Sequence, residues 1–152
     1  MAEFAKIILF DLHGTLVNDS LHLYRGIRAC IEELSRREYR LAVVTTQVHE
    51  RAENILRTAG VATYFQAIVG SDDAEKIKPA PDPIFLAISL LRGSSRNAIM
   101  IGDSLRDLQA GRAAGTRVAA ALWGARRKRE LIAFHPDCLD RKSTRLNSSH
   151  LG

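Results

Sequence analysis

The stretch from Phe10 to Val17 reads FDLHGTLV. It continues an apolar run that begins at Ile7 and turns polar at Asp11. A continuous apolar run of this length, followed by a turn signal, predicts a buried β-strand. Asp11 therefore lies at the carboxyl end of that strand, and the flexible Gly14 follows in a turn.

Strand and helix patterns alternate along the rest of the chain. Further apolar runs predict strands at 41–44, 67–69, 98–101 and 117–122, and a last strand, cut short, at 135–139. Helical patterns lie between them at 23–37, 52–59, 84–91, 104–114 and in a basic segment after 125. The stripe at 84–91 places four apolar side chains inward: Ile84, Phe85, Ile88 and Leu91. Apolar strands alternating with amphipathic helices predict an α/β domain of three layers, with a parallel sheet covered on both faces.

Polar side chains follow four of the predicted strands at their carboxyl ends. They are Asp11 and His13, Thr45 and Thr46, Asp72 and Asp73, and Asp103. In open α/β sheets the ligand site lies beyond the carboxyl ends of the strands. We therefore expect these residues to converge on one crevice, with Asp72 and Asp73 as loop polarity rather than as ligands.

The composition is that of one globular domain. The chain has 152 residues, of which 46% are hydrophobic and 26% charged, and this length buries a sizeable core. No apolar run approaches the roughly 18 residues of a membrane span, and the first residues lack a signal-peptide pattern. Cys30 and Cys138 form neither a disulfide framework nor a zinc motif. We expect a soluble, cytoplasmic protein without a membrane partner.

The last stretch, Asp140 to Gly152, is polar and aperiodic. Its segment DRKSTRLNSSH resembles a translated DNA-sequencing adapter, so we expect a domain over 1–139 and a non-native tail over 140–152. On this hypothesis the native C-terminus is truncated and a sheet edge is exposed. The tail carries part of the net charge of +5, and the remaining basic cluster, Arg126 to Arg129, fits a solvated helix start. Nucleic acid is therefore not an expected partner.

Four motifs in order carry a family resemblance: FDLHGTLV, VVTTQ, KIKPAPD and IGDSLRD. Together they resemble the haloacid dehalogenase-like (HAD) hydrolase superfamily, and the second half is most similar to its phosphoglycolate-phosphatase branch. The resemblance covers about residues 5–139. It implies a Rossmann-like core and Mg²⁺-dependent hydrolysis of phosphomonoesters.

The resemblance also implies catalytic and substrate-binding roles. Asp11 would be the nucleophile, which attacks phosphorus and forms an aspartyl-phosphate. Thr45 would hydrogen-bond the phosphate, and Thr46 stands beside it where the family usually has Asn. Lys78 would neutralise the nucleophile and the phosphate together, with Lys76 as the rival for that role.

The same resemblance implies a Mg²⁺ site. Its ligands would be the carboxylates of Asp11 and Asp103 and the backbone carbonyl of His13, which survives any change of side chain. Asp107 lies one helical turn after Asp103 and would anchor the metal directly or through water. Alternatively, Asp107 only stabilises the start of its helix.

His13 departs from the family pattern, because phosphatases of this family have an Asp there that protonates the leaving oxygen and later activates water. An imidazole exchanges protons near neutral pH, but it is longer than an Asp side chain. Such proton catalysis is typically worth about 10²–10⁴-fold. We expect a phosphatase of reduced or altered activity. Two alternatives stay open: a pseudoenzyme that binds phosphate or a phosphorylated partner, and a dehalogenase or phosphonate hydrolase.

Only 34 positions separate Asp11 from Thr45, and a predicted helix fills most of that gap. Relatives on the phosphoglycolate branch usually insert a cap domain there, and none fits here. The crevice is therefore expected to be open, closed only by substrate, by a small flap near Val17 to Asp19, or by a second subunit. An open crevice favours larger phosphate substrates or a homo-oligomer.

Overall fold

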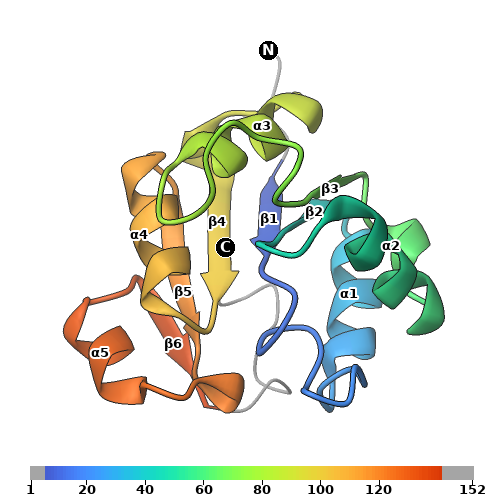
Figure 1. The fold of residues 1–152 in the computed structure, drawn as a ribbon, viewed down its shortest axis with the longest axis horizontal. Coiled ribbons are helices and arrows are strands. Elements are labelled where there is room, and N and C mark those ends of the chain that lie inside the picture. The colour runs from blue at the N-terminus through green and yellow to red at the C-terminus, as the bar shows by residue number, and fades with distance from the viewer. Residues whose placement is uncertain (1–5, 142–152) are drawn as a thin grey trace.

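The protein is a three-layer α/β fold built on one parallel sheet (Figure 1), and its computed structural model describes residues 6–141. The strands are β1 (Ile7–Phe10), β2 (Arg40–Val44), β3 (Ala67–Val69), β4 (Ala98–Gly102), β5 (Arg117–Ala121) and β6 (Cys138–Asp140). Their spatial order is β3-β2-β1-β4-β5-β6, and every neighbouring pair is parallel. The predicted fold class is confirmed.

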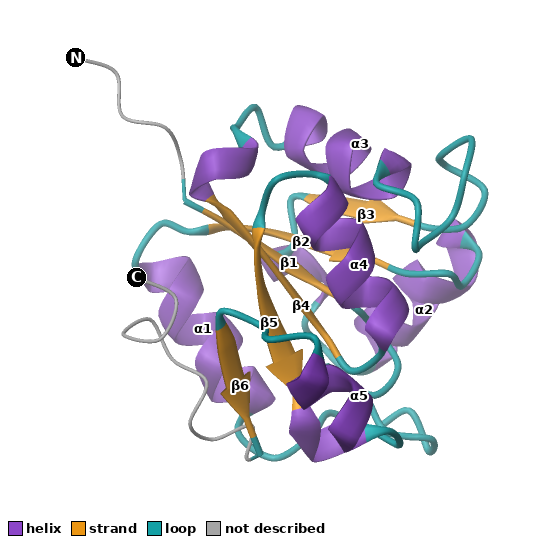
Figure 2. Ribbon diagram, turned by 90° about the vertical axis from the view of Figure 1, so that its left-hand side faces the viewer, coloured by secondary structure: helices purple, strands orange, loops and turns teal. Residues whose placement is uncertain are grey.

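Helices cover both faces of the sheet (Figure 2). They are α1 (Ile27–Arg36), α2 (His49–Thr58), α3 (Asp82–Leu90), α4 (Leu105–Ala113) and α5 (Lys128–Ala133). The apolar side chains of α1 and α2 form one core cluster, and those of α3, α4 and α5 form the other. Each cluster packs against alternate residues of the strands, because successive strand side chains point to opposite faces.

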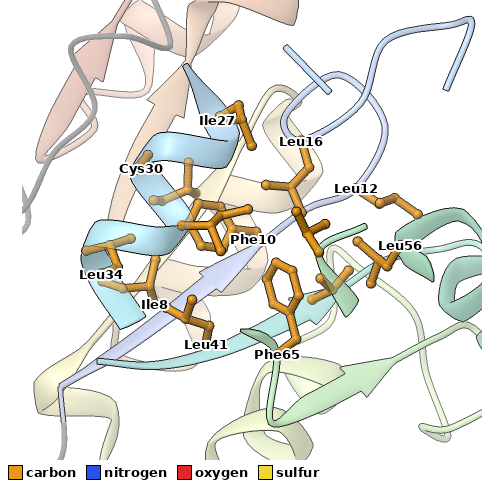
Figure 3. Packing of buried hydrophobic residues seen from close by; sticks show 14 of the residues in the cluster. Ile8, Phe10, Leu12, Leu16, Ile27, Cys30, Leu34, Leu41, Leu56 and Phe65 are labelled. Carbon is orange, nitrogen blue, oxygen red and sulfur yellow. The ribbon is translucent and has the colours of Figure 1, made fainter. Parts of the chain in front are cut away.

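Strand β1 supplies the centre of both cores. Ile8 and Phe10 pack on the side of α1 and α2, and Ile7 and Leu9 pack on the opposite side. Figure 3 shows Phe10 in the cluster on the side of α1 and α2. Its ring meets that of Phe65 edge-on, with centroids 6.2 Å apart. Burial of each such side chain contributes about 1.5–3 kcal/mol, so the strand that carries Asp11 at its end is firmly held.

Two details of the predicted helices are wrong. The helix predicted from residue 23 begins at Ile27, because Gly26 adopts a left-handed backbone with φ 85° and the preceding residues fold back. Tyr24 donates its backbone N–H to Leu16 there. Phe85, predicted to point inward, is 49% exposed, since α3 turns Ile84 rather than its neighbour toward the sheet.

The connection from β1 to α1, residues 11–26, is a small flap. Val17 forms isolated bridges with His13 and with Leu23. The Asn18 side chain accepts hydrogen bonds from the backbone of Ser20 and His22, which closes the tip. In the described part of the chain, neither this connection nor residues 70–81 between β3 and α3 contains an inserted domain. The cap is absent, as the sequence predicts.

The far edge of the sheet includes the first residue of the predicted tail. Asp140 is the last residue of β6, is buried, and pairs with Ala121 of β5. The rest of that predicted tail, from 142 on, lies outside the described residues. Over residues 6–141, no helix combines the length and the apolar character that crossing a membrane requires.

Candidate active site

The carboxyl ends of β1, β2 and β4 place three predicted residues beside one another. Asp11 follows β1 and donates its backbone N–H to Ile101 of β4, 2.9 Å away. Thr45 follows β2, and Asp103 follows β4. Strands β1 and β4 are adjacent at the point where the strand order reverses, which is where α/β sheets open a crevice.

Lys78 reaches this point from the loop between β3 and α3. Its Nζ lies 3.0 Å from Asp11 Oδ1, 2.5 Å from Asp107 Oδ1 and 2.9 Å from the carbonyl oxygen of Val44. The side chains of Lys78 and Asp107 are each only 2% exposed. Lys76, the rival in the sequence, is exposed. Lys78 therefore sits where a cation contacts the predicted nucleophile.

The charges of this cluster shift one another's protonation. Burial lowers the pKa of Lys78, but the carboxylates of Asp107 and Asp11 outweigh burial and raise it. Burial and the negative charge of Asp11 raise the pKa of Asp107 to about 6, against the opposing effect of Lys78. Burial, and then the nearby Asp103, raise the pKa of Asp11, although Lys78 acts in the opposite direction.

Asp107 also organises the start of α4. Its Oδ2 accepts hydrogen bonds from the backbone N–H of Ser104 at 3.1 Å and from the Ser104 hydroxyl at 2.9 Å. One oxygen thus holds the helix start, as the second reading of Asp107 expects, and the other holds Lys78, while the metal-binding role of Asp107 stays a prediction. Each carboxylate oxygen of Asp107 already has a protein partner, which favours contact with a metal through water rather than directly.

The Gly14–Thr15 turn packs tightly against Asp103. Gly14 has φ 81°, and a Cβ atom there would lie 2.0 Å from Asp103 Oδ2, so only glycine fits. The Thr15 hydroxyl lies 3.3 Å from Asp103 Oδ1. The backbone oxygen of Thr15 accepts a hydrogen bond from Trp123 Nε1 at 3.0 Å, so the segment after β5 holds this turn.

His13 lines the same crevice, but its ring is partly enclosed. Its Nε2 is buried and has no hydrogen-bond partner among residues 6–141. A buried polar nitrogen without a partner costs free energy, and such exceptions call for an explanation in the chemistry of a site. In this conformation Nε2 is shielded from a group that enters the crevice.

A small hollow joins these residues. It encloses ≈ 190 Å³ and is lined by Asp11, His13, Thr45, Thr46, Lys78, Asp103, Ser104, Arg106 and Asp107. The hollow thus brings together all the residues predicted to act in catalysis, substrate binding or metal binding. The sequence predicts no role for Ser104 and Arg106, although both lie in the motif IGDSLRD. It also gives no role to the single tryptophan, Trp123, because no local pattern indicates its contact with Thr15.

Asp72 and Asp73 do not converge on the crevice, contrary to that part of the expectation. Asp72 Oδ1 accepts the backbone N–H of His49 at 2.8 Å, at the start of α2. Asp73 Oδ2 lies 2.5 Å from His49 Nδ1 and 2.7 Å from the backbone N of Gly70. Both carboxylates hold a loop and a helix start, in agreement with their reading as loop polarity.

The donor set fits a divalent metal ion. One carboxylate oxygen from each of Asp11, Asp103 and Asp107 lies within 4.8 Å of the others. Lys78 contacts two of these three carboxylates, so carboxylate charge exceeds the charge of this lysine, and a divalent cation would reduce that excess. Carboxylate oxygens are also the ligands that this ion prefers.

Comparison with known proteins places this geometry in a family. Residues 14–121 match the sequence profile of the haloacid dehalogenase-like hydrolases. The chain is 34% identical over 134 residues to pyrophosphatase PpaX of Listeria monocytogenes serotype 4a (strain HCC23), covering 88% of this chain and 60% of that protein. PpaX of Bacillus velezensis is 33% identical over 136 residues, covering 90% and 61%. The chain thus spans about 60% of the length of these curated relatives.

Two solved structures illustrate the likeness of the folds. CbbY from Rhodobacter sphaeroides in complex with phosphate is 29% identical, with a TM-score of 0.76 over 86% of this chain and 59% of that chain. A mutant of CbbY in complex with xylulose-(1,5)bisphosphate has a TM-score of 0.85 at 21% identity, over 97% and 99%. The second likeness concerns the fold alone.

Proposed function

The chain belongs to the haloacid dehalogenase-like hydrolase family, and we propose that it is a phosphomonoester hydrolase that uses Asp11 as its nucleophile. The observation that carries this proposal is the contact of Lys78 Nζ with Asp11 Oδ1 at 3.0 Å in a hollow at the carboxyl ends of the strands. The curated relatives named pyrophosphatase and the neighbour in complex with phosphate support a phosphate substrate.

The proposed reaction has two displacements. One carboxylate oxygen of Asp11 forms a bond to phosphorus while the bond from phosphorus to the ester oxygen breaks, and the released alcohol takes up a proton. Water then attacks the phosphorus of the aspartyl-phosphate, which frees inorganic phosphate and restores the carboxylate. Two easier displacements thus replace one difficult one.

The surrounding residues would bind and orient the phosphoryl group. Lys78 places positive charge against Asp11 and the phosphoryl oxygens, where charge has to be stabilised. The Thr45 hydroxyl accepts the backbone N–H of Gln47 at 3.1 Å, and it would donate its own proton to a phosphoryl oxygen. Thr46 is exposed at the mouth and would meet the rest of the substrate.

We propose Mg²⁺ as the cofactor. Asp11, Asp103 and the backbone carbonyl of His13 would hold it, and Asp107 would anchor it through water, since its oxygens already contact Lys78 and Ser104. When bound, the ion supplies Lewis-acid stabilisation of the phosphoryl oxygens. The contact between Thr15 and Asp103 at 3.3 Å would then orient a ligand, as outer partners of metal sites do.

His13 is proposed as the group that moves protons to the leaving oxygen and from the attacking water. Its enclosed Nε2 supports reduced activity, since that nitrogen has to become accessible before it exchanges a proton with substrate. The same observation favours a second candidate function. If the ring stays enclosed, the hollow binds phosphate or a phosphorylated partner without turnover.

The test is Mg²⁺-dependent hydrolysis of an aryl phosphate by the native sequence, Asp11→Asn and His13→Asp. We expect slow native turnover, none for Asp11→Asn, and a gain of up to about 10²-fold for His13→Asp, which restores a short carboxylate. The control is Asp72→Asn, which lies outside the hollow and should match the native rate. Native activity that persists in Asp11→Asn would refute the proposed nucleophile.

A silent native protein that His13→Asp activates would instead support the binding function, which calorimetry with inorganic phosphate would then measure.

We also propose a cytoplasmic location. Both cysteines are free, and burial raises the pKa of the Cys30 thiol to about 11, which leaves this side chain inert.

A further inference from the structure

A second, larger pocket opens beside the catalytic hollow. It encloses ≈ 550 Å³ between the start of α4 and the segment that leads into α5. Asp103, Ser104 and Arg106 line both spaces, so the two adjoin. Ligand sites usually enclose about 300–1,000 Å³. The hollow of ≈ 190 Å³ fits a phosphoryl group alone, and the second pocket has the size for the rest of a substrate.

Three arginines line this second pocket. Arg106 comes from α4, and Arg126 and Arg127 come from the segment after β5. The acidic side chains of the lining are Asp103 and Glu130, and Glu130 lies 3.4 Å from Arg127. The three arginines outnumber these two carboxylates, so the pocket lining carries a surplus of positive charge.

Weak protein contacts leave these guanidinium groups available. Arg126 meets Asp19 at 3.6 Å, with both side chains at least 85% exposed, and such surface pairs are worth little. Arg106 has no hydrogen bond or ion pair within residues 6–141. Arginine presents a planar fork of donors that matches phosphate and carboxylate oxygens.

We propose that the substrate is a small phosphomonoester whose leaving group carries a second anionic group, bound by Arg106, Arg126 and Arg127. This inference rests on the proposed function, because it assigns the first phosphate to Asp11. Arg106 bounds both spaces, so it would sit between the two anionic groups. The three arginines are thus specificity-determining residues, and the basic cluster has a use beyond a solvated helix start.

Kinetics with matched substrates test the inference. The native protein is assayed with an aryl phosphate, a sugar bisphosphate and a phosphorylated carboxylic acid, which separates a second phosphate from a carboxylate. We expect kcat/KM to be higher for the doubly anionic substrates. Arg106→Gln should lower it for these by about tenfold, the size of one lost charge-assisted hydrogen bond, and should lower it by less for the aryl phosphate, which has no second anionic group.

Arg129→Gln is the control, because it removes the same charge from the same basic cluster but does not line the pocket. Equal losses in Arg106→Gln and Arg129→Gln would overturn the inference in favour of general electrostatic attraction. Native turnover with no preference for a second anionic group would also overturn it, while the proposed function would stand.

Binding to Asp11→Asn separates the two proposals. This variant keeps the arginine pocket, and calorimetry compares its affinity for the sugar bisphosphate with that for the corresponding monophosphate. Tighter binding of the bisphosphate that Arg106→Gln abolishes would support the inference even if the native protein shows no turnover. Equal affinities for the two ligands would refute it.

Discussion

Gly102→Ala tests whether the buried pair of Asp107 and Lys78 governs activity. A Cβ atom at Gly102 would lie 2.2 Å from Asp107 Cβ and 2.4 Å from its Oδ2. Carbon atoms in contact lie about 3.5–4.0 Å apart, so the Asp107 side chain has to move by more than about 1 Å. That shift breaks its 2.5 Å contact with Lys78 and with it the position of the cation on Asp11.

The expected loss is large in rate and moderate in stability. Misplacement of about 1 Å in a catalytic site costs about 10²-fold in kcat/KM, and overpacking of a core costs about 1–3 kcal/mol. The assays are aryl phosphate hydrolysis with Mg²⁺ and urea unfolding of the same samples. Activity is compared at a temperature at which both proteins are folded.

Gly111→Ala is the matched control. Its Cβ would lie 2.8 Å from Met100 Cβ and 2.8 Å from Val118 Cγ1, so it also overpacks the core, but it meets no residue of the site. We expect Gly111→Ala to lose stability and keep kcat. The reasoning is refuted if Gly102→Ala keeps the native rate, or if both variants lose activity equally.

Three further perturbations act on separate parts of the molecule. Lys78→Met should abolish hydrolysis and lower the free energy of unfolding by about 3 kcal/mol, because it leaves buried carboxylates unpaired. The double variant with Asp107→Leu should regain part of that stability in urea unfolding but should not regain turnover. Trp123→Phe removes one hydrogen bond worth about 1 kcal/mol and should raise the Mg²⁺ concentration needed for half-maximal rate, and an unchanged Mg²⁺ titration would contradict its positioning role. The hydrogen bond to Asp73 raises the pKa of His49. The stabilisation that protonated His49 gives the fold is therefore complete below the unfolded pKa of about 6.5, and it is lost as the pH rises through the folded pKa. Urea midpoints of the native and His49→Gln proteins should differ at pH 6 and agree at pH 9.

The sheet was predictable because its signals are local. Apolar runs of three to five residues separated by amphipathic stripes specify buried parallel strands without any knowledge of tertiary contacts. Helix ends were less predictable. The apolar Leu23 belongs by pattern to α1, but it pairs with Val17 in the flap because Gly26 interrupts the helix.

The site was predictable to the extent that it depends on strand ends. Asp11 and Asp103 meet because β1 and β4 are adjacent and in register. Asp73 misses the crevice because the loop after the edge strand β3 turns back to His49, a contact no local pattern encodes. The position of Arg106 in the second pocket likewise depends on how α4 packs beside the segment after β5, and the sequence does not show that packing.

The buried charges themselves argue for chemistry rather than for stability. Removal of charged groups from water costs several kcal/mol for each ion, and well-packed apolar residues often give equal or greater stability in their place. A fold selected only to persist would therefore have little use for Lys78, Asp11 and Asp107 in contact at the end of its central strand. Their arrangement is explained if an anionic group and a divalent metal ion complete the charge balance. In that case the contact that costs stability is also the contact that prepares the site for phosphate.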